Sequence, residues 1–106
     1  MSIRTEKVTN VLTRLAAEFF EREASNASLI TVTHTDVTPD LKKATIYVSI
    51  FPDDKENAAI GFLKRHRSEL RDYVKSKMSM KTIPYFEVEI DAGEKNRQKI
   101  DDLLRQ

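Results

Sequence analysis

The 106-residue sequence contains no cysteine, no tryptophan, two glycines and three prolines. Without cysteine, the chain has no disulfide framework and no thiolate metal site. Gly61 and Gly93 alone cannot build a P-loop or a glycine-rich dinucleotide fingerprint. No segment approaches the roughly 18 to 20 consecutive apolar residues that span a bilayer. The first residues, MSIRTEKVTNVL, lack the apolar stretch of a secretory signal, so we expect a cytoplasmic protein.

Side chains for catalysis or metal binding are also scarce. His34 and Asp36 fall on one face of a predicted strand, which suggests a base and its orienting carboxylate, but no third group completes a site. The adjacent pairs Asp53-Asp54 and Asp101-Asp102 are expected to diverge into solvent. The sequence therefore predicts no enzyme, no cofactor and no metal site.

The charge of the chain is unevenly distributed. The formal net charge is +1, but residues 62–81 contain seven basic side chains against Glu69 and Asp72. This segment carries +5 and the other 86 residues carry −4. Such asymmetry favours a polyanionic partner, although a solvated helix face gives the same pattern. With 40% hydrophobic and 33% charged residues, the chain is typical of a globular protein, and its length predicts one domain over 1–106.

Hydrophobic periodicity predicts the first three elements. A helix is expected over residues 4–24, because its apolar residues recur in steps of three and one. Residues 29–37 and 44–51 alternate and are β-branched, so they predict two strands, joined as an antiparallel hairpin through Pro39-Asp40. In the second strand, Ala44 and the following even-numbered residues form the expected core face. The inward face of the first strand is ambiguous, since Ile30 and Val32 share a face with His34.

A long helical pattern over 57–80 is interrupted at His66 and Arg67, which predicts two helices that meet at a kink. Asp53 or Asp54 is expected to cap the first of them. Residues 82–91 predict a third strand, and Pro84 near its start fits either an edge strand or the first residue of a strand.

A short closing helix is expected over 95–105, with Ile100, Leu103 and Leu104 inward. The element order is therefore helix, strand, strand, helix, kink, helix, strand, helix. This order predicts a two-layer α+β domain with the helices on one face of the sheet.

The hairpin sequence ITVTHTDVTPDLKKATIYVSIFPD resembles the central hairpin of the ribosome-binding factor A family. The matching positions are Thr38-Pro39-Asp40-Leu41, Ala44 and Ile46-Tyr47-Val48-Ser49. KTIPYFEVEID is similar to the third strand of that family, and residues 96–104 are similar to its closing segment. The resemblance covers roughly residues 4–104.

The resemblance implies a KH-like domain of the type II arrangement. It also implies a monomeric assembly factor that binds the small (30S) ribosomal subunit and its 16S rRNA during late maturation and rRNA processing. Members of the family carry Ala-X-Gly at the kink between two helices, where this chain has His66-Arg67-Ser68. The histidine in place of alanine puts the close packing at that kink in doubt. Some members carry a long charged C-terminal tail, and we expect none of its roles here.

The basic segment supplies the candidate RNA-binding side chains. Lys64, Arg67, Arg71 and Lys75 form a row at helical spacing that can follow a phosphate backbone. The full candidate set is Lys64, Arg65, His66, Arg67, Ser68, Arg71, Lys75 and Lys77, together with Arg4, Lys7 and Arg14 of the first helix.

Three alternatives remain open at this stage. His66 either contacts RNA or is a half-buried kink residue. Tyr73 and Tyr47 either stack on bases or pack in the domain. A protein–protein adaptor that uses an exposed strand edge, without direct RNA binding, is the alternative function.

Overall fold

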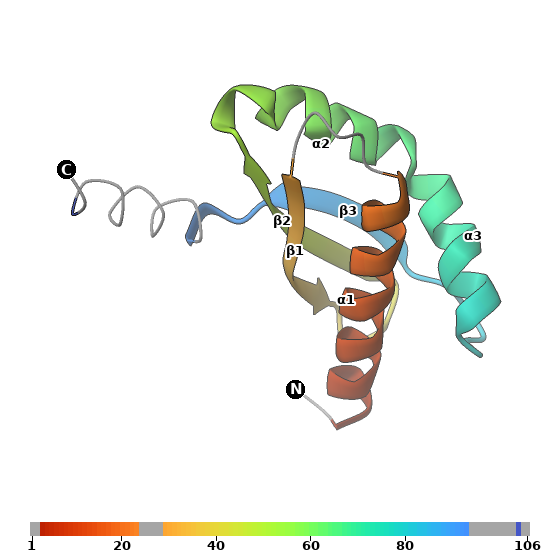
Figure 1. Ribbon diagram of the computed structural model, residues 1–106. Helices are drawn as coiled ribbons and strands as arrows, with labels where there is room; N and C mark the ends of the chain where they lie inside the picture. Colours follow the sequence, from red (N-terminus) through yellow and green to blue (C-terminus); the bar gives the residue numbers. More distant parts are fainter. Residues whose placement is uncertain (1–2, 24–28, 94–103, 105–106) are drawn as a thin grey trace.

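The computed structural model describes residues 3–23, 29–93 and 104. The element order is α1 (Ile3–Glu23), β1 (Leu29–Val37), β2 (Lys43–Phe51), the 3-10 turn η1 (Asp53–Lys55), α2 (Glu56–Arg65), α3 (Arg67–Lys77) and β3 (Tyr85–Ile90). The three α-helices gather on one side of a three-stranded sheet (Figure 1). The predicted first helix, hairpin, kinked helix pair and third strand are confirmed.

The sheet has the strand order β1-β2-β3. β1 and β2 pair antiparallel, with Val37 opposite Ala44. β2 and β3 pair in parallel, with Lys43 opposite Tyr85, because the α2–α3 segment crosses over between them. β3 is therefore an edge strand, one of the two positions that Pro84 fits, and Pro84 itself is buried just before the strand begins.

A β-bulge at Thr33 explains why the inward face of β1 was ambiguous. The register of β1 against β2 shifts at this residue. Before the bulge, Ile30 and Val32 pack against the core; after it, Thr35 and Val37 are buried. One extra residue exchanges the two faces of a strand. Even-numbered side chains therefore face inward before the bulge, and odd-numbered side chains face inward after it.

One hydrophobic core lies between the sheet and the helices. Its buried members are Leu12, Leu15, Ala16, Phe19 and Phe20 from α1, Ala59, Leu63, Leu70 and Val74 from α2 and α3, and Val37, Ala44, Ile46, Val48, Ile50, Phe86 and Val88 from the sheet. The predicted core face of β2 is confirmed. The buried hydroxyl of Thr35 accepts a 2.9 Å hydrogen bond from Oγ1 of Thr13, which satisfies it without solvent.

Two expectations about helix ends are wrong. Asp53 and Asp54 do not cap α2, because the chain first turns through η1 and no side-chain cap bond forms at Lys55, the N-cap of α2. Leu104 was expected to face inward, but it is 79% exposed. An apolar side chain in a charged terminal segment therefore finds little to pack against. The rest of the expected closing helix, including Ile100 and Leu103, falls outside the described residues.

No helix in the described ranges is both long enough and apolar enough to cross a membrane.

Candidate nucleic-acid interface

A single residue, His66, separates α2 from α3. Its backbone adopts φ −100° and ψ 15°, outside the α-helical region, so the helix axis changes direction at the predicted position. The N–H of His66 donates to the carbonyl oxygens of Phe62 and Leu63, both at 3.2 Å. Its own carbonyl accepts from the N–H of Leu70 at 3.0 Å. The backbone bonds therefore continue across the kink, which makes it a fixed corner.

The imidazole of His66 contacts one residue on each side of the kink. Its ring centroid lies 4.3 Å from that of Phe62, and its Nδ1 lies 2.7 Å from Oε2 of Glu69. The side chain is 27% exposed. These contacts and this exposure are those of a half-buried kink residue.

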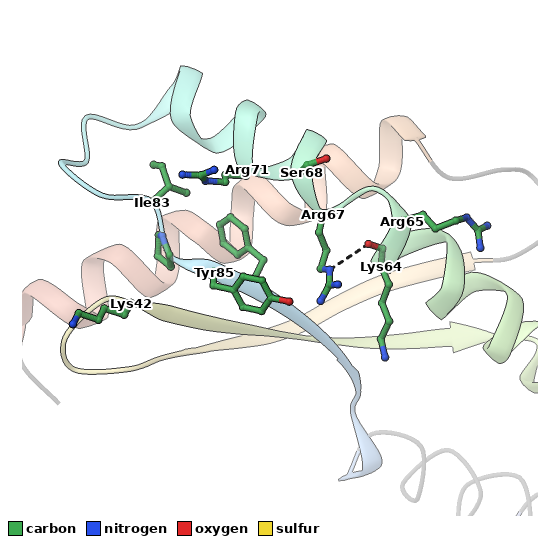
Figure 2. Close-up of a pocket in the computed structure, with 10 residues that line it drawn as sticks. Lys42, Lys64, Arg65, Arg67, Ser68, Arg71, Ile83 and Tyr85 are labelled. Atoms are coloured by element: carbon green, nitrogen blue, oxygen red, sulfur yellow. Dashed lines mark hydrogen bonds between the residues drawn. The ribbon is translucent and has the colours of Figure 1, made fainter.

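A concavity of about 550 Å³ lies between this kink and the start of β3. Its wall contains both basic and apolar side chains, drawn in Figure 2: Lys42, Lys64, Arg65, Arg67, Ser68, Arg71, Ile83, Pro84, Tyr85 and Phe86. We call this concavity the kink cavity. It is built from the ends of α2 and α3, the segment before β3, and the turn between β1 and β2.

Arg67 is the most constrained cation of the kink cavity. Its Nε donates a 3.2 Å hydrogen bond to the carbonyl oxygen of Lys64, the dashed line of Figure 2. Its Nη1 lies 3.7 Å from Oε2 of Glu87 on β3. The guanidinium carbon sits 5.4 Å from the ring centroid of Tyr85, a cation–π distance. The side chain thus links the helix corner to the edge strand.

Lys42 borders the kink cavity and belongs to a tightly bonded turn. Oγ1 of Thr38 donates at 2.6 Å to Oδ1 of Asp40, and the N–H of Lys42 donates to the same oxygen at 3.0 Å. These bonds, that of Thr38 first, lower the pKa of the Asp40 carboxyl below its usual value. Leu41 adopts φ 61°, a left-handed conformation that the surrounding bonds hold in place.

Five of the predicted site residues border the kink cavity: Lys64, Arg65, Arg67, Ser68 and Arg71. Arg65 points away from the others (Figure 2), and its Nη1 lies so close to Gly61 that a Cβ there would be 3.3 Å away. Lys75 continues the predicted row along α3 but does not reach the cavity wall.

The other predicted cations lie elsewhere. Nζ of Lys77 sits 5.8 Å from the ring centroid of Tyr73, whose ring packs on Phe19 of α1. Nε of Arg14 lies 4.0 Å from Oε1 of Glu18, and Lys7 is exposed on α1. The side chain of Arg4 falls outside the described part of the chain.

The two tyrosines that were weighed as stacking platforms both pack within the domain. The hydroxyl of Tyr73 donates to Oε2 of Glu18 at 3.0 Å, joining α3 to α1. Tyr47 stacks on His34 on the helix-free face of the sheet, with centroids 4.3 Å apart and ring planes 12° apart.

The carboxylate that faces His34 is that of Asp91, whose Oδ2 lies 3.3 Å from Nδ1 of the imidazole, whereas the sequence suggested Asp36. The bulge at Thr33 and the parallel pairing of β3 bring Asp91 to this position. Across the described ranges, no group of three or more histidine, aspartate or glutamate side chains is placed to hold a metal ion.

Sequence reasoning missed Lys42 and Tyr85. Both lie at the start of neighbouring parallel strands, and the N–H of Tyr85 donates to the carbonyl of Lys42 at 2.9 Å. Pro39-Asp40 did predict the turn that contains Lys42. Only the strand pairing, however, brings that turn to the kink.

Three comparisons with known proteins agree. Residues 4–104 match the family model of ribosome-binding factor A. Over 109 residues the chain is 37% identical to ribosome-binding factor A of Chlorobaculum parvum, and the match covers 99% of this chain and 91% of that protein. The fold is similar to the crystal structure of ribosome-binding factor A from Thermus thermophilus, with a TM-score of 0.73 at 22% identity over 81% of this chain and 94% of that one.

A homology model of the Thermus thermophilus factor, as fitted into a cryo-EM map of its complex with 30S, is also similar. The TM-score is 0.69 at 23% identity, over 76% of this chain and 88% of that one. These likenesses establish the KH-like α+β fold that the hairpin sequence implied.

Proposed function

The chain belongs to the ribosome-binding factor A family, and on that premise we propose that it binds the small ribosomal subunit through 16S rRNA. The family match over residues 4–104 supports this role. A Thermus thermophilus member of the family has been fitted into a map of a 30S complex, which supports the same partner. We place the binding in the cytoplasm, during late maturation of the subunit and processing of its rRNA.

The kink cavity is the observation that carries the proposal. Lys42, Lys64 and Arg71 border it from separate segments of the chain. None of the three forms a salt bridge with a carboxylate within the part of the chain that the structure describes. Cations without a protein partner remain available for phosphate oxygens, and Arg and Lys contacts to phosphates dominate the affinity of proteins for nucleic acids.

The mechanism that we propose is steric. The protein occupies a site on the immature particle as a monomer, holds the RNA in one arrangement, and dissociates when maturation is complete. Arg67 is suited to hold RNA, because its contacts with Lys64 and Glu87 fix its guanidinium before binding. We assign the primary site to the kink cavity, and Lys75, Lys77, Lys7 and Arg14 to surfaces outside it.

The adaptor alternative depends on a free strand edge, and both edges are poorly suited to it. The bulge at Thr33 interrupts the ladder pattern of β1, and bulges discourage pairing with another strand. At the other edge, β3 has six residues and its first, Tyr85, lies beneath the guanidinium of Arg67.

Co-sedimentation with 30S subunits over a series of salt concentrations tests the proposal. We expect Lys64→Glu/Arg71→Glu to abolish most binding at low salt. The matched variant Lys55→Glu/Lys81→Glu makes the same change in net charge away from the kink cavity, and we expect it to retain binding. Unchanged binding by the folded first variant would overturn the role of the cavity. Binding that resists salt but is lost with Ile90→Pro in β3, whose N–H points away from β2, would favour the adaptor.

A further inference from the structure

We propose that a second cavity of the domain is a docking groove for a protein partner, and that it takes an extended segment whose aliphatic side chains are flanked by carboxylates. The cavity has a volume of about 350 Å³. Its half-buried lining includes Val8, Leu41, Met78 and Met80, and its exposed lining includes Lys42 and Lys81. We call this cavity the methionine groove. Of its described lining residues, only Lys42 also borders the kink cavity, so the two cavities are separate surfaces.

The methionine groove lies where three distant segments of the chain meet. The first half of α1 supplies Val8, the turn between β1 and β2 supplies Leu41, and the connection between α3 and β3 supplies the two methionines. These segments lie at the same end of the molecule (Figure 1). The volume falls in the lower part of the roughly 300 to 1,000 Å³ range of ligand pockets, which suits a few anchoring side chains.

The floor of the groove is aliphatic. Val8, Leu41 and Met78 pack against the hydrophobic core, so most of the floor is fixed before a partner arrives. Met80 is half-buried but does not pack against the core, and the core therefore does not account for an apolar residue at this position. Among the described residues, no aromatic ring borders the groove, so a nucleotide base would find no ring to stack on. Methionine side chains adapt their shape to aliphatic partners.

The rim of the groove is basic and selects the charge of the partner. Lys42 and Lys81 are exposed, and neither forms a salt bridge with a carboxylate in the part of the chain that the structure describes. Asp40 also borders the groove, but its Oδ1 already accepts hydrogen bonds from Oγ1 of Thr38 and the N–H of Lys42. Two cations thus remain available for the carboxylates of a partner, and charge complementarity favours an acidic segment.

The connection between α3 and β3 leaves backbone groups available along the groove. Met78 has extended backbone angles, φ −124° and ψ 139°. Across residues 79–82, no backbone N–H or carbonyl group is hydrogen-bonded to another residue of the described ranges. An extended peptide can pair with such groups as it pairs with the edge of a sheet, while its side chains enter the adjoining pocket. These backbone groups favour a protein segment as the occupant.

The methionines of the groove allow a direct measurement. Besides Met1, Met78 and Met80 are the only methionines of the chain, so labelling methionine methyl groups with ¹³C places NMR signals in the groove. Met78→Leu and Met80→Leu assign the two signals. The ligand is a synthetic peptide of about six residues, with two leucines flanked by glutamates. We expect this peptide to shift both signals, and a matched peptide with lysines in place of the glutamates to leave them unchanged.

Variants of the rim and the floor test the two parts of the groove separately. Lys81→Glu should weaken binding of the glutamate peptide roughly 3- to 30-fold, whereas Lys55→Glu, the same change at η1, should stay within about twofold of the wild type. Met80→Gln keeps the length of the side chain but makes it polar, and should weaken binding about 5- to 30-fold, followed at the Met78 signal. Thermal unfolding checks that each variant is folded, and Lys81→Glu suffices where Met80→Gln is not.

The other possible occupants are outcomes of the same titration. Absence of shifts with the glutamate peptide would overturn the groove, and so would equal shifts with the two peptides. A single-stranded RNA of about eight nucleotides that shifts both signals, where the glutamate peptide does not, would assign the groove to nucleic acid. Signals that move with protein concentration alone would assign it to a second copy of the chain. Each of these results contradicts an acidic protein segment, and none of them bears on 30S binding through Lys64 and Arg71.

Discussion

The hydroxyl of Thr33 donates a 2.6 Å hydrogen bond to Oδ2 of Asp91, which joins the bulge of β1 to the residue that follows β3. The bond spans the width of the sheet on the face that no helix covers. Asp91 also donates its N–H to the carbonyl of Val48 at 2.8 Å, and its carboxylate faces His34. All three strands are therefore tied together at this point by polar contacts.

Replacing Thr33 with valine should destabilise the domain by about 1 to 3 kcal/mol. Valine keeps the β-branched shape but leaves the carboxylate of Asp91, only 17% exposed, without this donor. Chemical denaturation measures the change in the free energy of unfolding. Thr31→Val, at an exposed position of the same strand, is the control and should stay within about 0.5 kcal/mol. Similar losses for the two variants would contradict a special role for the bond.

The turn that carries Lys42 should depend on pH through Asp40. Its pKa is lower in the folded protein, so the charged carboxylate stabilises the fold above its unfolded-state pKa of about 4. This stabilisation is lost as the pH falls through the lower, folded-state pKa. Asp40→Asn keeps an acceptor oxygen and does not titrate.

We therefore expect the wild type to be more stable than Asp40→Asn near neutral pH, and the difference to shrink as the pH falls below about 4. Unfolding by urea, at several pH values between about 7 and 3, measures the difference. A stability gap that stays constant over this range would exclude the carboxylate as its source.

The elements of this fold follow from local patterns. The apolar stripe of α1 and the break in the stripe at His66 depend on residues a few positions apart, and so both were readable. The inward face of β1 was not readable. Thr33 fits either side of a strand, and only pairing with β2 shows that it is the bulged residue.

The kink cavity depends on contacts between distant parts of the chain. Lys64, Arg67 and Arg71 belong to one helical row and were predicted as such. Lys42 and Tyr85 join them through the parallel pairing of β2 with β3, a relation that no local pattern encodes. Lys75 belongs to the same helical row but does not border the cavity, and the row alone could not show where the cavity ends.

Substitution of Lys42 tests whether the kink cavity binds the subunit, because the neighbouring Lys43 does not border the cavity and serves as a control. Lys42→Ala should weaken binding to 30S and reduce the slope of log affinity against log salt by about one unit, as loss of a single phosphate contact does. Lys43→Ala removes the same charge and should alter the slope less. Co-sedimentation across a salt series gives both values. Equal effects of the two substitutions would mean that net charge, and not the cavity, governs binding.

Substitution of His66 tests whether this residue stabilises the kink or contacts RNA. Its ring covers Phe62 and its Nδ1 meets Glu69, so His66→Ala should expose the phenylalanine and cost about 1 kcal/mol of stability. The side chain does not border the kink cavity, so affinity for 30S at a temperature where the variant is fully folded should change less than twofold. Glu69→Gln, which weakens only the polar contact, should show a smaller loss of stability.

Thermal unfolding and co-sedimentation of the same preparations measure the two effects of His66→Ala. A variant of normal stability that binds 30S many times more weakly would make His66 a direct RNA contact. The expected result, reduced stability with retained affinity, follows from geometry. The imidazole contacts Phe62 with its ring and Glu69 with its Nδ1. We therefore expect His66 to stabilise the kink, whose neighbouring residues Lys64 and Arg67 border the cavity.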